Sequence, residues 1–366
     1  MKISFILPAI FGTGGINVVY EYSKRLGEFG HDVEIYAPIL AYNMHRGNSI
    51  VDVLKQIYAT MKTMKWVYID HIPSKISKEK KVGIKTVWKI GNKYIRDNDV
   101  VIATAWCTAF DVAKLRKSKG EKVYFIQGLE IWDNEELGRR SYQLPMKKIT
   151  IAKWIKDKLV REHGCQDKEI DVVNNGIDCN KFTIDEKEYD HDGEIRCLML
   201  DHTLPQKGVK YGVEAYKKAK KKYPDISLAM FGMKKSNYVP EGAEYHLNPS
   251  QDELINLYRE ADVFIFPSIE EGWGLTPIEA MACKCAVVGS NVACMLDIGK
   301  DGENVILCDP KDTDAMTRSI LMLIKDRQLR EKIAENGYKT VQTLDWEVSS
   351  RKLESLLLQL GLSEEQ

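Results

Sequence analysis

The sequence predicts an α/β protein made of two Rossmann-like halves, each a parallel β-sheet covered by helices. Its 366 residues exceed the length at which a single hydrophobic core usually keeps growing. Short apolar runs alternate with longer amphipathic stretches, a rhythm typical of parallel sheets that carry helices on both faces. The composition, 44% hydrophobic and 29% charged, is that of an ordinary globular protein.

Short apolar runs are the expected strands, and amphipathic stretches between them are the expected helices. Strands in the first half are expected at Ile3–Leu7, Asp32–Ala37, Val100–Thr104, Lys122–Ile126 and Lys148–Ala152. In the second half they are expected at Ile195–Leu200, Ile226–Phe231, Ala243–His246, Val263–Phe266, Ala286–Gly289 and Asn304–Leu307. The helices are expected at Asn17–Phe29, Val209–Lys222, Gln251–Glu260 and Asp314–Ile324. Ligands of open parallel sheets bind beyond the carboxyl ends of the strands, so the site is expected there.

Patterns for membrane spans and metal sites do not appear in the sequence. No apolar run reaches the roughly 18 residues that a transmembrane helix needs. The segment Met1–Pro8 fits a first strand better than a signal peptide. Neither the eight cysteines nor the seven histidines show the spacing of zinc ligands. We therefore expect reduced thiols and a cytoplasmic location.

The segment Glu270–Glu279, EEGWGLTPIE, directly follows the run Val263–Ser268. It predicts a buried strand, a loop bracketed by glycines and a helix that begins at Pro277, since proline suits the first helical position. The first turn of such a helix offers unpaired N–H groups and partial positive charge to a phosphate.

Two carboxylates flank this loop, Glu271 within it and Glu279 in the first turn of the helix. Glycines 272 and 274 let the backbone approach a ligand closely. Amides for a diphosphate and carboxylates for hydroxyls suit a nucleotide sugar. The same carboxylate pair also occurs in glycoside hydrolases, but those enzymes have no use for a phosphate site.

A second glycine loop, Gly12–Gly15, lies between the first strand and the first helix. A dinucleotide fingerprint would require another glycine at Asn17, so a nicotinamide-dependent oxidoreductase is disfavoured. A glycine loop at the start of a helix still offers N–H donors to an anion.

The run E-G-W-G-L-T-P-x-E at 271–279 resembles the E-x7-E motif of glycosyltransferase family 4, the retaining enzymes of the GT-B fold. Further similarities are the segment Thr150–Asn180 that joins the domains, and Trp346 in the returning tail. The resemblance covers nearly all of residues 145–355 and, more loosely, the first half. It implies an N-terminal domain at 1–180, a C-terminal domain at 181–345, and a helix at 346–366 that packs back on the first.

The resemblance also implies roles for individual residues. Glu271, Lys207 and Gly15 are expected to be catalytic. Donor binding is expected from Gly14, His202, Lys207, Gly208, Phe231, Gly232, Glu271, Gly272, Trp273, Gly274, Leu275, Thr276 and Glu279, with Glu279 on the ribose hydroxyls. The acceptor side is expected to include Gly14, Gly15, Trp106 and Thr108.

The chain departs from the family pattern at several places, among them Ala293-Cys294 in place of a glycine pair and Asp297 in place of a glutamate. The family commonly has Gly-Arg where this chain has Asp201-His202, so a bidentate phosphate partner is missing and a protonated His202 substitutes only in part. The family often has a histidine after the strand Val100–Thr104, where this chain has Ala-Trp-Cys-Thr. That segment and the run Tyr124–Glu130 resemble the rhamnosyltransferase-like branch.

The resemblance implies transfer of a sugar from a UDP-, GDP- or dTDP-linked donor to a hydroxyl of a glycan or lipid-linked acceptor, with retention. No Asp-x-Asp motif is placed to chelate the diphosphate, so we expect no metal and no obligatory cofactor. Two alternatives stay open. One is another GT-B nucleotide-sugar enzyme, such as an epimerase or a disaccharide phosphate synthase. The other is a catalytically weak sugar-nucleotide binding subunit.

Charge is unevenly distributed along the chain. Residues 1–175 hold 29 Lys and Arg against 20 Asp and Glu, and the rest hold 24 against 33. The segment Lys55–Arg96 alone has 11 basic and two acidic residues, and Val51–Met64 has the pattern of an amphipathic basic helix. This segment suits the anionic inner face of the cell membrane or a phosphate-bearing acceptor. The alternative is a solvated helix packed on its own sheet, and nucleic acid is disfavoured by the neutral net charge.

Overall fold

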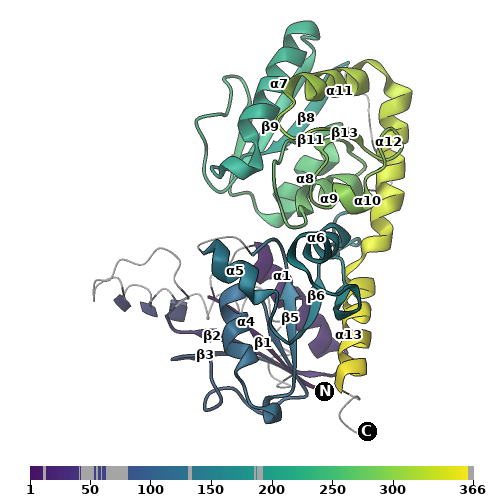
Figure 1. Ribbon diagram of the computed structural model, residues 1–366. Coiled ribbons are helices and arrows are strands. Elements are labelled where there is room, and N and C mark those ends of the chain that lie inside the picture. Colours follow the sequence, from purple (N-terminus) through teal and green to yellow (C-terminus); the bar gives the residue numbers. More distant parts are fainter. Residues whose placement is uncertain are drawn as a thin grey trace. The chain divides into compact units, whose positions relative to one another are not determined.

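The computed structural model describes residues 1–10, 14–40, 42, 53–54, 57–58, 60–62, 81–130, 134–184, 187 and 193–361. The chain divides into two compact units. Unit 1 comprises Met1–Asn175 together with Glu347–Gln366, and unit 2 comprises Gly176–Trp346. Figure 1 shows the elements of each unit, and each unit is described separately below.

Unit 1 is built on a parallel sheet of strand order β3-β2-β1-β4-β5-β6-β7. Its strands are β1 Lys2–Ile6, β2 Asp32–Pro38, β3 Val82–Val87, β4 Val100–Ala103, β5 Glu121–Ile126, β6 Lys147–Thr150 and β7 Ile170–Val172. Its helices are α1 Gly14–Glu28, α4 Trp106–Ala113, α5 Glu135–Ser141, α6 Lys153–His163 and α13 Trp346–Gly361.

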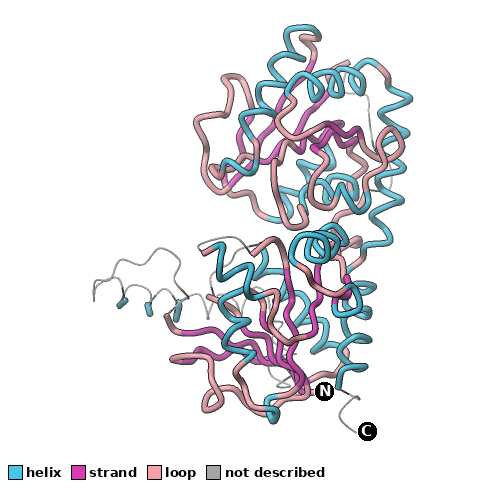
Figure 2. The backbone as a smooth tube through the Cα atoms, in the orientation of Figure 1, coloured by secondary structure: helices cyan, strands magenta, loops and turns pink. Residues whose placement is uncertain are grey.

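Unit 2 is built on a second parallel sheet, of order β10-β9-β8-β11-β12-β13. Its strands are β8 Ile195–Leu200, β9 Ile226–Gly232, β10 Glu244–Leu247, β11 Val263–Phe266, β12 Ala286–Ser290 and β13 Ile306–Cys308. Its helices are α7 Val209–Lys222, α8 Gln251–Glu260, α9 Leu275–Ala282, α10 Met295–Ile298, α11 Thr313–Lys325 and α12 Arg327–Val341. Figure 2 shows strands and helices alternating along the chain in both units.

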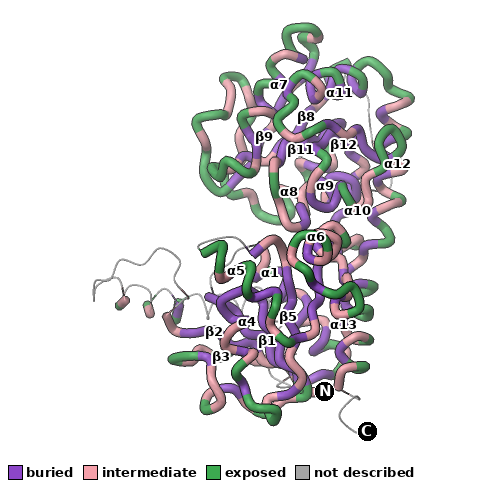
Figure 3. Tube along the Cα trace, viewed as in Figure 1, coloured by how far each residue is buried: buried purple, intermediate pink, exposed green. Residues whose placement is uncertain are grey.

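The central strands are buried on both faces. Every residue of β4, β11 and β12 is buried, and Figure 3 shows this core in each unit. Helices cover both faces of a parallel sheet, which is why these strands read as continuous apolar runs instead of alternating ones. The predicted fold class, α/β with two Rossmann-like parallel sheets, is confirmed.

The last helix returns to unit 1. In α13, Glu354 Oε1 lies 2.7 Å from Nε2 of His31, and the guanidinium of Arg351 stacks 3.5 Å from the centre of the Phe29 ring. Unit 2 begins at Gly176, five residues before the expected boundary. The reason is that Ile177 donates to the Leu344 carbonyl at 2.8 Å and accepts from the Trp346 N–H at 3.1 Å, both within unit 2.

The expected strands are all present, with ends that differ by at most two residues. Strands β3 and β7 were not expected, because β3 lies in the lysine-rich segment and β7 has only three residues. Helix α1 begins at Gly14, three residues before Asn17, so Gly14 and Gly15 lie in its first turn and not in a loop.

Candidate functional site

The candidate donor site lies in unit 2, where the loops after β8 and β11 meet. These strands are neighbours in the parallel sheet, so their carboxyl ends lie side by side. The carbonyl of Gln206 accepts the N–H groups of Ile269 at 2.7 Å and Glu270 at 3.3 Å. These bonds hold the loop that carries Lys207 against the loop that carries Glu271.

Gly208 makes this close approach possible. Its φ of 62° lies in the left-handed region. A Cβ at this position would lie 1.9 Å from the carbonyl oxygen of Pro267, a distance at which no side chain fits. A glycine is therefore required directly after Lys207.

Lys207 and Glu271 form an ion pair in this corner of unit 2. Lys207 Nζ lies 2.7 Å from Glu271 Oε1, and the hydroxyl of Ser268 donates to the same oxygen at 2.7 Å. The Glu271 side chain is 8% exposed and that of Lys207 is 26% exposed. An ammonium group has three donors, so Lys207 keeps donors for a phosphate while it binds Glu271.

Trp273 anchors the turn between Glu271 and α9. Its indole is buried, and its carbonyl accepts the N–H of Cys294 at 2.7 Å. Gly274 follows with a φ of 82°, and a Cβ there would come within 3.1 Å of Glu271 Oε2. The indole is thus used for packing, and the backbone at Gly274 lies close to the Glu271 carboxylate.

Helix α9 begins earlier than the sequence indicated. It starts at Leu275, so Pro277 is its third residue and not its first, and Glu279 lies in its second turn. Proline is tolerated there because the first-turn N–H groups have no intrahelical acceptor. The N–H groups of Leu275 and Thr276 belong to the same turn, and the partial positive charge of this helix end favours an anion.

Glu279 accepts a hydrogen bond from Tyr258. The Tyr258 hydroxyl lies 2.8 Å from Glu279 Oε2. Burial raises the pKa of Glu279 to about 7, although the Tyr258 hydrogen bond acts in the opposite direction. The Glu279 carboxyl group therefore titrates near neutral pH. Above its pKa it is ionised and accepts hydrogen bonds from hydroxyl groups.

His202 follows β8 and is oriented by the backbone. Its Nδ1 accepts the N–H of Leu204 at 3.0 Å, so the neutral ring carries its proton on Nε2. Burial, followed by the nearby charge of Lys207, lowers the pKa of His202. His202 is thus a neutral donor at physiological pH, which argues against the cationic role considered for it in place of an arginine.

Phe231 and Gly232 have packing roles in this structure. The ring of Phe231 is buried, with its centre 5.8 Å from that of Tyr258. A Cβ at Gly232 would lie 2.4 Å from the Asp201 carbonyl oxygen. The donor contact expected of this pair stays a prediction.

In unit 1, a hollow of about 280 Å³ lies at the carboxyl ends of β1, β4 and β5. Gly15 lines it from the first turn of α1, and Gln127 and Glu130 line it from the segment after β5. Gly14 is the first residue of α1. The other two members of the predicted loop, Gly12 and Thr13, lie outside the described residues.

Trp106 and Thr108 serve the structure of α4. The hydroxyl of Thr108 is fully buried and accepts the N–H groups of Thr104 and Ala105, both at 3.1 Å. The Trp106 ring is buried against Phe110 at 6.4 Å, edge to face. Neither side chain lines the hollow, and the acceptor contact expected of this pair stays a prediction.

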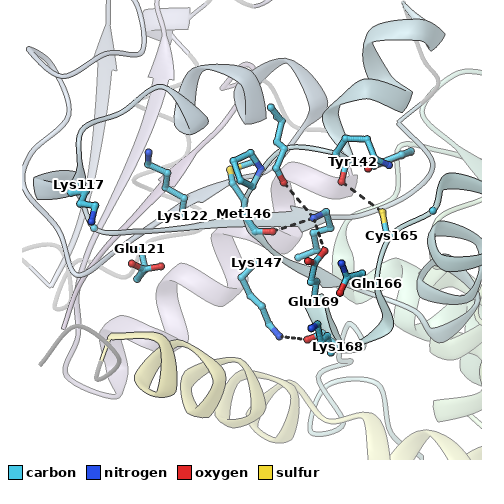
Figure 4. A pocket seen from close by; sticks show the side chains of 16 residues that line it. Lys117, Glu121, Lys122, Tyr142, Met146, Lys147, Cys165, Gln166, Lys168 and Glu169 are labelled. Atoms are coloured by element: carbon cyan, nitrogen blue, oxygen red, sulfur yellow. Dashed lines mark hydrogen bonds and ion pairs between the residues drawn. The ribbon is translucent and has the colours of Figure 1, made fainter. Parts of the chain in front are cut away.

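A second hollow of unit 1, of about 810 Å³, lies at the opposite edge of the sheet, where β5 and β6 begin. Figure 4 shows several lysines among its lining residues. Lys148 Nζ is bound by the Met146 carbonyl at 3.2 Å, and Lys147 Nζ by the Lys168 carbonyl at 3.1 Å. These lysines stabilise turns at the amino ends of the strands. Ligands of parallel sheets bind at the carboxyl ends, so we do not take this hollow as the candidate site.

Part of the basic segment Lys55–Arg96 lies outside the described residues, namely 55–56, 59 and 63–80. Over the parts of the chain that the structure describes, no helix is both long and apolar enough to cross a bilayer. Over the same parts, no three His, Cys, Asp or Glu side chains cluster in a way that would hold a metal ion.

Sequence reasoning did not single out several side chains of the two sites. Ser268 and Tyr258 contact Glu271 and Glu279 in unit 2, and Gln127 and Glu130 line the hollow of unit 1. Ser268, Gln127 and Glu130 all follow the carboxyl end of a predicted strand, and this position in the sequence could have indicated them as site residues. Tyr258 lies within α8, and no sequence pattern connects it to Glu279.

Comparisons with known proteins agree with this geometry. Residues 180–340 match the family model described as glycosyl transferases group 1. CapM of Staphylococcus aureus, a capsular polysaccharide biosynthesis glycosyltransferase, is 27% identical over 215 residues, which cover 53% of this chain and 56% of CapM. The chain therefore spans little more than half the length of such a relative.

One relative matches over a longer stretch. An N,N'-diacetylbacillosaminyl-diphospho-undecaprenol alpha-1,3-N-acetylgalactosaminyltransferase of Campylobacter jejuni is 22% identical over 353 residues, 91% of this chain and 87% of that protein. Among solved structures, Anabaena HepE in complex with UDP and glucose has a TM-score of 0.76 at 15% identity. The superposition covers 98% of this chain and 100% of HepE. At that identity the similarity shows the GT-B fold alone.

Proposed function

We propose, from the membership of this chain in glycosyl transferases group 1 through residues 180–340, that it transfers a sugar from a nucleotide diphosphate to an acceptor hydroxyl. The reaction proceeds with retention at the anomeric carbon, and no metal ion is needed. The observation that carries the proposal is the ion pair of Lys207 and Glu271, 2.7 Å apart, beside the first turn of α9. An ammonium and helix N–H groups together neutralise a departing diphosphate.

In this proposal the donor binds unit 2. Lys207 and the first-turn amides of α9 hold the diphosphate, Glu271 and the backbone of 272–274 contact the sugar, and Glu279 holds the ribose hydroxyls. Gly14 and Gly15 lie on the acceptor side, in unit 1. The acceptor is a glycan or a lipid-linked sugar of a cell-surface polymer, supported by the printed roles of the CapM and Campylobacter relatives.

A thermal-shift panel tests the donor proposal. We expect one of UDP, GDP and dTDP to raise the melting temperature of the full chain, because a ligand at about 100 times its Kd adds about 2.7 kcal/mol of stability. The Lys207→Met variant is expected to lose that shift, whereas Lys210→Met, which removes an exposed lysine three residues away, keeps it. If all three nucleotides leave the melting temperature unchanged, the proposal fails.

We further propose that unit 1 docks on an anionic membrane surface. Residues 53–54, 57–58 and 60–62 are helical, and Leu54, Tyr58 and Met61 are exposed at the spacing of one helical face. On the other side, Thr60 is buried and donates to the Ile39 carbonyl at 3.1 Å. An exposed apolar stripe within a lysine-rich segment fits lipid headgroups.

Vesicle co-sedimentation tests this docking. We expect the full chain to bind vesicles that contain phosphatidylglycerol more tightly than neutral phosphatidylcholine vesicles. The triple change Leu54→Ser, Tyr58→Ser and Met61→Ser should weaken binding at least about tenfold, since each buried apolar side chain contributes about 1.5–3 kcal/mol. Met233→Ser removes an exposed apolar side chain of unit 2 and serves as the control. Equal binding by the triple variant would refute the docking surface.

A further inference from the structure

The hollow of unit 1 combines apolar walls with two polar side chains. Leu7, Pro8, Ile16 and Leu129 contribute apolar surface, and Gln127 and Glu130 contribute an amide and a carboxylate. Its volume of about 280 Å³ is close to the lower end of small-molecule sites, roughly 300 Å³. The hollow lies at the carboxyl ends of the strands, where parallel sheets bind ligands.

The amide of Gln127 is unsatisfied in this hollow. Its Oε1 atom is buried and has no hydrogen-bond partner within the described part of the chain. The amide packs on Gly15, where a Cβ would lie 3.3 Å from Oε1. A buried acceptor without a partner is destabilising, and a hydroxyl group of a ligand would supply the missing donor.

Glu130 places a negative charge beside this amide. Its side chain is 4% exposed, and its Oε2 accepts the N–H of Trp106 at 2.9 Å, at the first turn of α4. Its backbone N–H donates to the Tyr142 hydroxyl at 2.6 Å, which fixes the segment. A carboxylate accepts up to about four hydrogen bonds.

We infer that this hollow binds a neutral sugar ring, the acceptor's terminal residue, and that Gln127 and Glu130 determine its specificity. This inference rests on the proposed function. Hydroxyl groups donate to the amide oxygen and the carboxylate, and the apolar walls cover the C–H face of the ring. The carboxylate repels phosphate, so the acceptor presents an uncharged sugar here and not a sugar phosphate.

Saturation-transfer NMR on the full chain tests the inference. The probes are the methyl glycosides of glucose, galactose, mannose and N-acetylglucosamine, with glucose 6-phosphate and inorganic phosphate as anionic probes. We expect at least one methyl glycoside to bind, and the shape-preserving variants Gln127→Met and Glu130→Gln to weaken it at least about tenfold. Glucose 6-phosphate is expected to bind more weakly than methyl glucoside, and inorganic phosphate is expected not to compete with the bound glycoside.

Two further variants make the result specific. Gly15→Ala displaces the Gln127 amide without changing the chemical identity of either polar side chain, and it should weaken glycoside binding as Gln127→Met does. Lys210→Met alters an exposed lysine of unit 2 and should leave glycoside binding unchanged. Circular dichroism confirms that each variant is folded.

The inference is overturned if no methyl glycoside binds, if the three unit 1 variants bind it as the unchanged protein does, or if the sugar phosphate binds more tightly. The nucleotide thermal shift is measured on the same samples. A nucleotide shift without glycoside binding refutes the acceptor site but leaves the donor proposal intact. Glycoside binding without any nucleotide shift supports the hollow as a sugar site and refutes the transferase.

Discussion

The Lys207→Met variant is expected to turn over the donor about a hundred to a thousand times more slowly than the unchanged protein, the loss that follows removal of one preorganised charge donor. The leaving diphosphate gains negative charge as the sugar bond breaks, and Lys207 is the ammonium next to the α9 amides. Because the interaction strengthens as charge develops, kcat should fall more than the donor KM rises. Steady-state kinetics with the nucleotide sugar identified by the thermal-shift panel measure both values.

The same change affects stability through Glu271. Its carboxylate, 8% exposed, would keep the Ser268 hydroxyl but lose its ammonium partner. We expect a loss of about 1–2 kcal/mol, smaller than for a fully buried pair because Lys207 is partly exposed. The double variant Lys207→Met with Glu271→Gln removes both charges, so it should recover stability but not activity.

This contrast separates catalysis from folding. If the double variant recovers both activity and stability, Lys207 acts only as the structural partner of Glu271 and the diphosphate role is wrong. Lys210→Met, an exposed lysine stacked 4.8 Å from the centre of the Tyr211 ring, is the matched control and should keep full activity.

The positions of Lys207 and of the 271–279 run at strand ends could be predicted because each is a local feature of the sequence, and their role in donor binding stays a prediction. Lys207 follows one strand, and the 271–279 run follows another, so strand order and the crevice rule sufficed to locate both. The bond between Lys207 and Glu271 joins positions 64 apart, and only the pairing of β8 with β11 brings them together. That pairing is a property of the sheet, which no local pattern encodes.

Errors arose where side-chain packing overrides a local signal. Pro277 marked the start of a helix, but Gly274, with its left-handed φ, allows α9 to begin two residues earlier. Thr108 and Trp106 also follow a strand, and they hold the start of α4 in place; their expected acceptor contact stays a prediction. Strand β3 was not predicted because lysine residues surround it in the sequence.

In both units, polar side chains lie at the carboxyl ends of the parallel strands. In unit 2 a lysine and helix amides create a positive corner beside Glu271, and in unit 1 Glu130 and Gln127 create an acceptor-rich hollow. In the proposals above, a corner that attracts anions holds the diphosphate in unit 2, and a hollow with a carboxylate holds the neutral sugar in unit 1.

The Gly208→Ala variant is expected to lose about 3–5 kcal/mol of stability, near the upper end for a single change. Two effects add. A φ of 62° costs an alanine about 1–2 kcal/mol, and the new Cβ, 1.9 Å from the Pro267 carbonyl oxygen, forces the backbone to move. For a unit of this size, each kcal/mol of lost stability lowers the melting temperature by about 2–4 °C. We therefore expect the melting temperature of Gly208→Ala to fall by about 10 °C.

Gly242→Ala is the matched control, because Gly242 in the same unit has a φ of 78° but no atom within 4 Å of the added Cβ. It should show the backbone strain alone, about 1–2 kcal/mol, and keep nucleotide binding. Gly208→Ala should also lose the nucleotide-induced thermal shift at temperatures where it is still folded, because the loop that carries Lys207 can no longer lie against Pro267. Equal losses of stability in the two variants, with nucleotide binding retained in both, would show that the close contact at Gly208 does not position the lysine.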